Sequence, residues 1–235
     1  MITGILVALP EELHTLTKTK IKQGECITMT KNIIIILSGA GPENARIAAQ
    51  TLIDQGAKQL ISWGCAGAIA PYLKAGDLLI PESIYTQSQR LIATHTSWSK
   101  KIIANLANST KYYTGTLLES DSVVALAQAK NRLHQSTHAL AIDMESGAVA
   151  RIAQEAQVPF IALRSIVDPA NLDLPNAIHY AMTKSGVVSI PKLMLYLCHH
   201  PHELPRLIKL GLNFHAASKT LKHLAQQLPQ ITQAQ

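Results

Sequence analysis

Three carboxylates follow closely on apolar segments that have the character of buried strands: Glu12, Glu145 and Asp168. Carboxyl groups around a dry pocket suit the cleavage of a glycosidic bond. One protonates the leaving group, a second activates water, and a third holds sugar hydroxyls and favours an oxocarbenium-like transition state. Taken singly, each residue also has an ordinary explanation, as an acid at the start of a helix or as a turn residue. Their shared position after a strand favours the chemical explanation.

Two glycine-rich turns follow two further apolar segments, at residues 39–41 and 64–67. The first is not a dinucleotide fingerprint, because its sixth position is Asn44 and no acid follows about 20 residues on after a second strand. Such a turn still lets the backbone approach a ligand or places a helix N-terminus near an anion. Cys65, in the second turn, is interpreted as a small buried thiol, since no histidine partner is evident.

Strand-like and helix-like segments alternate along the chain, and this order predicts the frame that must hold these residues. Continuous apolar strands in this alternation are typical of a mostly parallel sheet covered on both faces. Ligands of such sheets bind outside the carboxyl ends of the strands, so the three carboxylates are expected on one rim. We predict an α/β fold, a single-domain three-layer sandwich with a mixed, mostly parallel sheet and C-terminal helices. Strands are expected at 2–9, 25–30, 32–38, 59–63, 77–86, 111–118, 139–143 and 159–167, and helices after Gly41 and at 97–108 and 144–157.

The C-terminal segment differs from the rest in charge and pattern. Residues 190–235 hold five basic residues and one acid, which is +4 of the total formal charge of +6. Apolar residues recur there at alternating spacings of three and four, which makes one stripe on a helix: 207, 210, 214, 217, 221, 224 and 228. Packing on the body or on a sister subunit is the default interpretation, and a helix on an anionic membrane surface is the alternative. We therefore divide the chain into a catalytic domain (1–200) and a basic amphipathic helix packed on it (201–235).

Composition excludes several classes of protein. The chain has 235 residues, of which 47% are hydrophobic and 15% charged, so it is neither disordered nor a coiled coil. Three scattered cysteines indicate no disulfide framework and no zinc site, and no apolar run is long enough to span a membrane. Without a signal peptide pattern, a cytoplasmic location is expected. The basic balance comes without any nucleic-acid-binding motif, so no nucleic acid partner is expected.

Four stretches of the chain together resemble the nucleoside phosphorylase superfamily, in particular the methylthioadenosine/S-adenosylhomocysteine nucleosidases. They are GILVALPEEL, LSGAGPENARIAAQTLI, SWGCAGAIAPYLKAGDLLIP and AIDMESGAVARIAQEAQVPFIALRSIVDPAN, in family order over roughly residues 1–170. The tail, with CHHPHELPRLIKLGLNFHAASKTL, is similar to the hopanoid-associated branch. Members of that branch are thought to remove adenine from adenosylhopane. The resemblance implies an enzyme that cleaves the N-glycosidic bond of an adenine nucleoside.

The resemblance also implies a role for each matching residue. Glu12 corresponds to the glutamate that activates water, and Asp168 to the aspartate that protonates N7 of the purine. Substrate-binding positions are implied at Cys65, Ala66, Gly67, Val123, Val124, Met144, Glu145 and Arg164. Among these, the glutamate of the Met-Glu pair binds ribose hydroxyls and the methionine packs on the sugar. The two valines fall where the backbone reads adenine, and the arginine supports the site.

Several positions depart from the nucleosidase pattern. Val167 stands where the nucleosidases have a serine before the catalytic aspartate, and its apolar character is expected to raise the pKa of Asp168. Cys65 replaces a serine, which weakens one polar contact. The loop after residues 77–86 is short and lacks an aromatic cluster, which would open the pocket on the 5′ side of the ribose.

Water and phosphate are both used as nucleophile in this superfamily, and hydrolysis is favoured here. Ser62 stands near where hexameric phosphorylases carry a phosphate-binding arginine, and Glu12 would repel phosphate. Arg46 and Arg90 leave phosphorolysis open, with phosphate as co-substrate. No metal and no other cofactor is expected. The expected partner is a small nucleoside, lipid-linked in the hopanoid case, and peripheral membrane contact, a homo-oligomer and a non-catalytic nucleoside sensor stay open.

Overall fold

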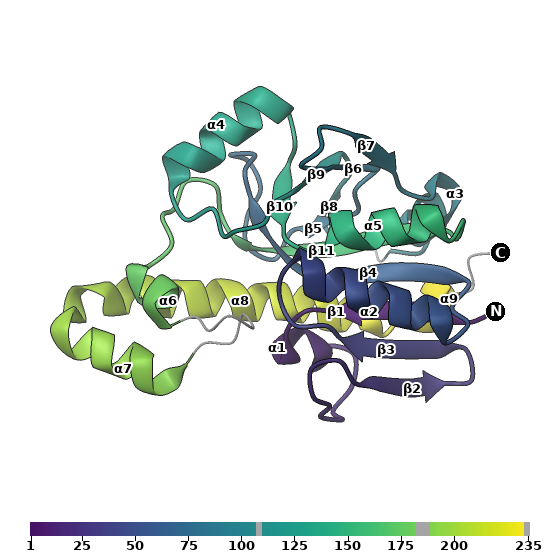
Figure 1. Ribbon diagram of the computed structural model, residues 1–235. Helices are drawn as coiled ribbons and strands as arrows, with labels where there is room; N and C mark the ends of the chain where they lie inside the picture. Colours follow the sequence, from purple (N-terminus) through teal and green to yellow (C-terminus); the bar gives the residue numbers. More distant parts are fainter. Residues whose placement is uncertain (107–109, 182–188, 233–235) are drawn as a thin grey trace.

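A mixed sheet forms the centre of the molecule in the computed structural model, which describes residues 1–106, 110–181 and 189–232 (Figure 1). Within these residues the strand order is β2-β3-β1-β4-β10-β9-β6-β7, and β11 pairs with β4 and with β5, which in turn pairs with β8. The strands are β1 (Thr3–Val7), β2 (Cys26–Thr30), β3 (Ile33–Leu37), β4 (Gln59–Ala68), β5 (Leu78–Leu79), β6 (Ser83–Tyr85), β7 (Leu91–Ala93), β8 (Tyr112–Tyr113), β9 (Thr116–Glu119), β10 (Ala141–Asp143) and β11 (Phe160–Asp168).

The long strand β4 is the hub of this sheet. It pairs in parallel with β1 and with β11, and its last residues pair antiparallel with β10. Its sequence, QLISWGCAGA, is almost continuously buried, as expected for a strand covered on both faces. The ends of β1, β10 and β11 therefore all come close to residues 64–68 of β4.

Helices cover both faces of the sheet, and each layer of helices packs on the sheet to form a hydrophobic cluster. One face carries α2 (Pro42–Asp54) and α5 (Ser146–Glu155), which also contact each other. The other carries α1 (Pro10–Leu13), α3 (Thr96–Asn105), α8 (Leu204–Ala225) and α9 (Leu228–Thr232). The remaining helices are α4 (Ala127–Thr137), α6 (Asn176–Ala181), α7 (Ile190–His199) and a 3₁₀ turn at Pro201–Glu203. The predicted three-layer α/β architecture with C-terminal helices is confirmed.

Five of the expected strands are found with ends shifted by one or two residues, and the other three differ in extent or are divided. The strand expected at 59–63 continues through the glycine-rich segment to Ala68, because small residues let β10 and β11 approach it from both sides. The segment 77–86 divides into β5 and β6, and 111–118 divides at Gly115. Each half pairs with a different neighbour, which a single apolar run does not reveal. The end of the helix expected at 97–108 lies outside the described residues.

The C-terminal helix α8 has two unlike halves. The second half packs on β11 and buries the later positions of the predicted stripe, Ala217, Leu221 and Leu224. The first half extends with α6 and α7 beyond the sheet as a helical projection (Figure 1). A second apolar stripe there was not predicted: Leu204, Ile208 and Leu212 are 48%, 57% and 65% exposed. Among the described helices, none is both long and apolar enough to cross a bilayer.

Candidate active site

Glu12 is a buried carboxylate held by backbone donors. Its Oε2 accepts hydrogen bonds from the amides of Ala8 (3.0 Å) and Leu9 (3.1 Å), and its Oε1 accepts from the amide of Cys65 (2.7 Å). Burial raises the pKa of the Glu12 carboxyl, while the Arg164 guanidinium and the three amides oppose the rise. A carboxyl in these surroundings can take up a proton at a higher pH than a surface glutamate, as a general base near neutrality requires.

The short helix α1 places Glu12 against β4. Pro10 opens the helix, and its missing N–H is no loss in a first turn. The turn is tied to the sheet by Thr15, whose hydroxyl donates to the Glu12 carbonyl and accepts from the indole of buried Trp63. A Cβ on Gly64 would lie 2.3 Å from Glu12 Oε1, so the glycine is what admits the carboxylate to the strand.

Glu145 reaches a different partner, the glycine turn after β3. Its Oε1 accepts a hydrogen bond of 3.0 Å from the amide of Gly41, and its Oε2 accepts from the Met144 amide at 3.3 Å. Gly41 has φ of +99°, a conformation that favours glycine. Burial, and then the nearby Asp143 carboxylate, raise the pKa of Glu145 to about 7. The two glycine-rich segments thus contact different carboxylates: the turn at 39–41 binds Glu145, whereas 64–67 is part of β4 and lies against Glu12 at Gly64 and Cys65.

A buried ion pair lies between these two carboxylates. Arg164 Nε donates to Asp143 Oδ2 at 2.7 Å, and its Nη2 donates to the hydroxyls of Ser62 (2.7 Å) and Ser146 (3.1 Å). The guanidinium also attracts Glu12 and Glu145 electrostatically and lowers the pKa of both. Arg164 is therefore the shared cation of the site, in keeping with the supporting role implied by the resemblance.

Asp168 is the last residue of β11 and lies beside the later part of β4, with Lys130 as its partner. Its register partner is Gly67, where an added Cβ would lie 3.7 Å from Asp168 Oδ2. The Lys130 ammonium donates to the same Oδ2 at 2.5 Å and its side chain is fully buried. Burial raises the pKa of Asp168, in the direction expected from its apolar surroundings, and Lys130 opposes the rise. The hydroxyl that Val167 cannot supply is replaced by an ammonium from α4.

The other expected binding residues lie around the same strand. Ala66 is buried in β4, and Met144 immediately follows β10, whose Ile142 pairs with Gly67. Val124 packs on the cluster that includes Ile142, whereas Val123 is 45% exposed. Burial, and then the charge of Glu12, raise the pKa of the Cys65 thiol well above its usual range, so this cysteine is not an activated nucleophile.

A cavity of about 230 Å³ adjoins Asp168. It lies between the loop after β11 and the first half of α8, and it is lined by Asp168, Asn171, Leu172, Asp173, Leu174, Pro175, Arg206, Lys209, Leu210 and Asn213. The loop is tied to the segment that carries the two valines, because Asp173 Oδ1 accepts from the Ala127 amide at 2.7 Å. The projection thus contributes one wall of the space beside the carboxylate.

Sequence reasoning missed two charged residues of this site. Asp143 is the last residue of the apolar segment 139–143. An acid at the end of a strand was the signal for the other carboxylates, and the same signal could have identified Asp143. Lys130 gave no such signal, because it stands in a polar helix, where a lysine normally faces solvent. Arg46, which the sequence left as a candidate for binding phosphate, forms a surface ion pair with Glu43 at 2.7 Å. The two side chains are 51% and 68% exposed.

With this geometry in place, comparison with known proteins identifies the family. Residues 3–185 match the family model described as the phosphorylase superfamily. The chain belongs to the phosphorylase superfamily. A 5′-methylthioadenosine/S-adenosylhomocysteine nucleosidase of Staphylococcus aureus (strain JH9) is 25% identical over 217 residues, covering 79% of this chain and 94% of that relative.

Solved structures show the same fold for this superfamily member. A nucleosidase of the same name from Neisseria meningitidis, in complex with methylthio-immucillin-A, has a TM-score of 0.71 at 16% identity, covering 100% of this chain and 99% of the other. A futalosine hydrolase of Helicobacter pylori strain 26695 has a TM-score of 0.71 at 21% identity, covering 98% and 97%. The resemblance of the four stretches to the phosphorylase superfamily and its nucleosidases is confirmed, and the matches support an enzyme of the purine nucleosidase type.

Proposed function

We propose that this protein hydrolyses the N-glycosidic bond of an adenine nucleoside. The observation that carries the proposal is that two buried carboxyls lie against the same strand, β4: Glu12 of α1 against Gly64 and Cys65, and Asp168 of β11 against Gly67. Burial raises the pKa of each carboxyl above that of a surface carboxyl, which is the direction that a proton-transferring group needs. The nucleosidases among the relatives support the same reaction.

The proposed reaction gives each group one task. Glu12 takes a proton from water as the water oxygen bonds to C1′ of the ribose. The C1′–N9 bond breaks, and Asp168 gives its proton to N7, so that adenine leaves as a neutral base. Glu145 holds ribose hydroxyls, and the negative charges of the site favour the oxocarbenium-like transition state. Water and these side chains suffice, and no cofactor takes part.

Hydrolysis is favoured over phosphorolysis by the charges beside Glu12. A phosphate oxyanion 4 Å from the Glu12 carboxylate would meet a repulsion of about 4 kcal/mol at an effective dielectric of about 20. Arg164, the cation that interacts electrostatically with Glu12, already forms an ion pair with Asp143, and Ser62 is a neutral side chain that accepts a hydrogen bond from Arg164. Phosphate dependence of the reaction would support the alternative, a purine nucleoside phosphorylase.

The proposed substrate carries a bulky apolar group at the ribose 5′ position, as adenosylhopane does. The support is the similarity of the tail to the hopanoid-associated branch and the tight β6–β7 hairpin, in which Thr86 and Arg90 close a short turn. A short turn leaves the 5′ side uncovered. Methylthioadenosine and S-adenosylhomocysteine are the alternative substrates.

The decisive experiment follows free adenine and the sugar product with and without phosphate. We expect adenine and free sugar from an adenosine bearing a long apolar 5′ substituent, with phosphate making no difference. Asp168→Asn is expected to lower the rate by about 10²- to 10⁴-fold while the circular dichroism spectrum is unchanged. Full activity of that variant would refute the assignment, and release from methylthioadenosine alone would refute the bulky substrate. A sensor module would bind the nucleoside and release no adenine.

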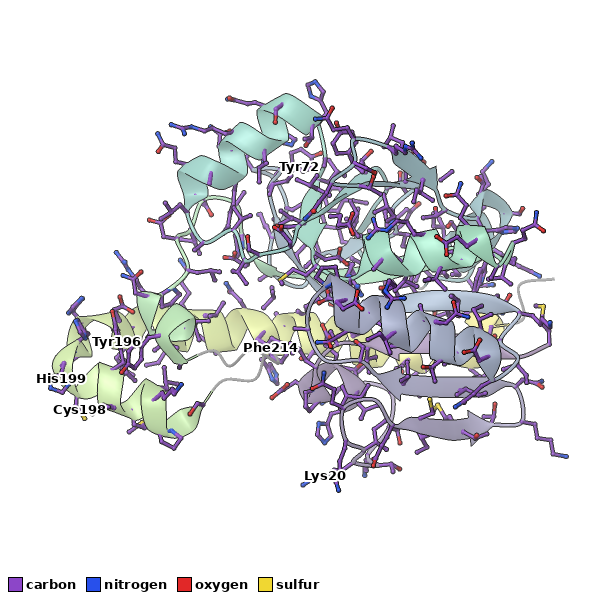
Figure 2. The ribbon with its side chains drawn as sticks, viewed as in Figure 1. Lys20, Tyr72, Tyr196, Cys198, His199 and Phe214 are labelled. Atoms are coloured by element: carbon purple, nitrogen blue, oxygen red, sulfur yellow. The ribbon has the colours of Figure 1, made fainter. Side chains whose placement is uncertain are left out.

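We further propose that the projection contacts an anionic membrane surface. The exposed stripe Leu204, Ile208 and Leu212 continues at helical spacing into basic Lys219 and Lys222 on the same helix, and the outer end of α7 carries the labelled Tyr196, Cys198 and His199 (Figure 2). Apolar side chains beside lysines suit an interfacial helix, and each lysine near the surface contributes about 1 kcal/mol.

Vesicle co-sedimentation tests this surface with point variants, because deleting the tail would remove the core residues of α8. Ile208→Ser with Leu212→Ser is expected to release the protein from vesicles containing anionic lipid, and high salt should do the same. Ile47→Ser, an exposed position on α2 that is 51% accessible, is the matched control. Unchanged sedimentation would contradict the membrane contact, and a change in oligomeric state would assign the stripe to a sister subunit.

A further inference from the structure

Lys130 is the most unusual residue of the described structure outside the expected site. Its side chain has no solvent exposure, although the helix that carries it, α4, is otherwise polar and buries no other residue. A fully buried lysine is rare because an ammonium loses its hydration and needs compensating partners. A lysine in this position therefore calls for an explanation in terms of what it binds.

All three protons of the ammonium have acceptors. Lys130 Nζ lies 2.5 Å from Asp168 Oδ2, 2.8 Å from the Leu172 carbonyl and 3.3 Å from the Pro169 carbonyl. Since an ammonium has three donors and no acceptor, it has no proton left for a ligand. Lys130 can act on a substrate only through Asp168 and through the loop whose carbonyls it binds.

The carboxylate is left with one free oxygen. Within the described residues, Asp168 Oδ2 is engaged by Lys130, and Oδ1 has no hydrogen-bond partner. Asp168 and Leu172 both line the cavity of about 230 Å³, so the ammonium fixes the carboxylate and its wall together. This is the arrangement that a carboxyl needs in order to present one oxygen to a ring nitrogen in a defined direction.

We propose that Lys130 is a positioning residue for the N-glycosidic reaction: its ammonium orients the Asp168 carboxyl toward N7 of the purine and holds the loop 169–172 beside it. The role rests on the proposed function. It adds a residue of α4 to the site: Lys130 makes the hydrogen bond to Asp168 that a hydroxyl at position 167 would otherwise make.

The charges that face Asp168 fix the direction of the expected pH effect. Two charged groups act directly on Asp168: Lys130 of α4 and Asp173 of the loop after β11. Two further cations, Arg206 and Lys209 of α8, line the same cavity. Burial raises the pKa of Asp168, Lys130 opposes that rise, and Asp173 adds to it. Removing the Lys130 charge therefore raises the pKa further. Because Asp168 must carry a proton to give to N7, the alkaline limb of the rate profile should move to higher pH.

The test compares Lys130→Met with Arg132→Met, an exposed position on the same helix. For Lys130→Met we expect kcat to fall by about 10²-fold, as for a misplaced catalytic group, with a smaller change in KM. We also expect the alkaline limb of kcat/KM to move up by at least half a pH unit. Lys130→Arg should return the limb toward the wild-type position, and Arg132→Met should leave both quantities unchanged.

Two outcomes would overturn the proposal. One is an unchanged pH profile in Lys130→Met, which would mean that the lysine only stabilises the fold. The other is an unchanged titration of the Asp168 carboxyl, followed by NMR with 13C-labelled aspartate and assigned with Asp168→Asn. If Lys130→Met does not fold, Lys130→Gln, neutral but polar, takes its place. The NMR titration does not depend on catalysis. If the wild-type protein releases no adenine, the proposed function is refuted, but the titration still shows whether Lys130 interacts with the Asp168 carboxyl.

Discussion

Replacing Glu145 by glutamine should change how the stability of the protein depends on pH. The carboxyl is 8% exposed and its pKa is raised from 4.5 to about 7, chiefly by burial and by the neighbouring Asp143. Between these two values the folded protein holds a proton that the unfolded chain has lost. The free energy of unfolding therefore falls as pH rises through this window, because the folded state must then bury a charge. Glutamine is always neutral and removes this cost.

The magnitude follows from the two pKa values. Each pKa unit corresponds to about 1.4 kcal/mol, and integrating the proton uptake from pH 5 to pH 8 gives a loss of about 2.5 kcal/mol from Glu145. Glu145→Gln should lack this loss. The variant should instead lose about 1 kcal/mol at every pH, because the NH2 group that replaces Oε2 cannot accept the hydrogen bond from the Met144 amide. For a chain of this size, 2.5 kcal/mol corresponds to a shift in Tm of about 5–10 °C.

Urea unfolding at pH 5 and pH 8 measures the effect. The difference in unfolding free energy between the two pH values should be smaller in Glu145→Gln than in the wild type by about 2.5 kcal/mol. Glu155→Gln, at an exposed position on the same helix, should keep the wild-type difference. Equal differences in the wild type and Glu145→Gln would refute the conclusion that burial raises this pKa.

Three further predictions test residues in and around β4. Glu12→Gln should lower adenine release by about 10²- to 10⁴-fold with an unchanged circular dichroism spectrum; an active variant would remove the base from the mechanism. Gly64→Ala, whose Cβ would lie 2.3 Å from Glu12 Oε1, should cost about 1–3 kcal/mol in urea unfolding, whereas Gly67→Ala, with its nearest neighbour at 3.5 Å, should be nearly neutral. Equal costs would contradict the close approach at Gly64. Arg164→Met should destabilise by about 3–5 kcal/mol because it leaves Asp143 buried without its cation, and a loss below 1 kcal/mol would count against that pairing.

Local pattern was enough to predict the architecture and the neighbourhood of the chemistry. Continuous apolar segments alternating with helices predicted a parallel sheet with two covered faces, because a strand buried on both sides needs apolar residues at every position. The position of an acid after such a strand predicted that Glu12 and Asp168 lie at one edge, since β1 and β11 run parallel to β4. Glu145 reaches the same neighbourhood by another route, because β10 pairs antiparallel with the end of β4. The later part of the C-terminal stripe was likewise visible, because its spacing of three and four residues survives into the fold.

The tertiary structure decided what those residues bind. The two glycine-rich segments differ in partner: the Gly41 amide, in a turn, donates to Glu145, and Gly64, within β4, makes room for Glu12. No spacing rule gives this division, because each contact joins segments distant in sequence. The breaks at 80–82 and at Gly115 also depend on which neighbouring strand each half pairs with.

Lys130 is the clearest example of a site residue that the sequence alone did not predict. By itself the sequence determined a phosphorylase-superfamily sheet with carboxylates on one edge, because the apolar or polar character of neighbouring residues shows which strands are buried and where they end. The tertiary structure alone decided that a lysine of a polar helix is fully buried and binds Asp168 across 38 positions of the chain. The physical reason is that burial and electrostatics depend on which atoms meet in space, and a charged residue in a helix carries no local sign of its partner.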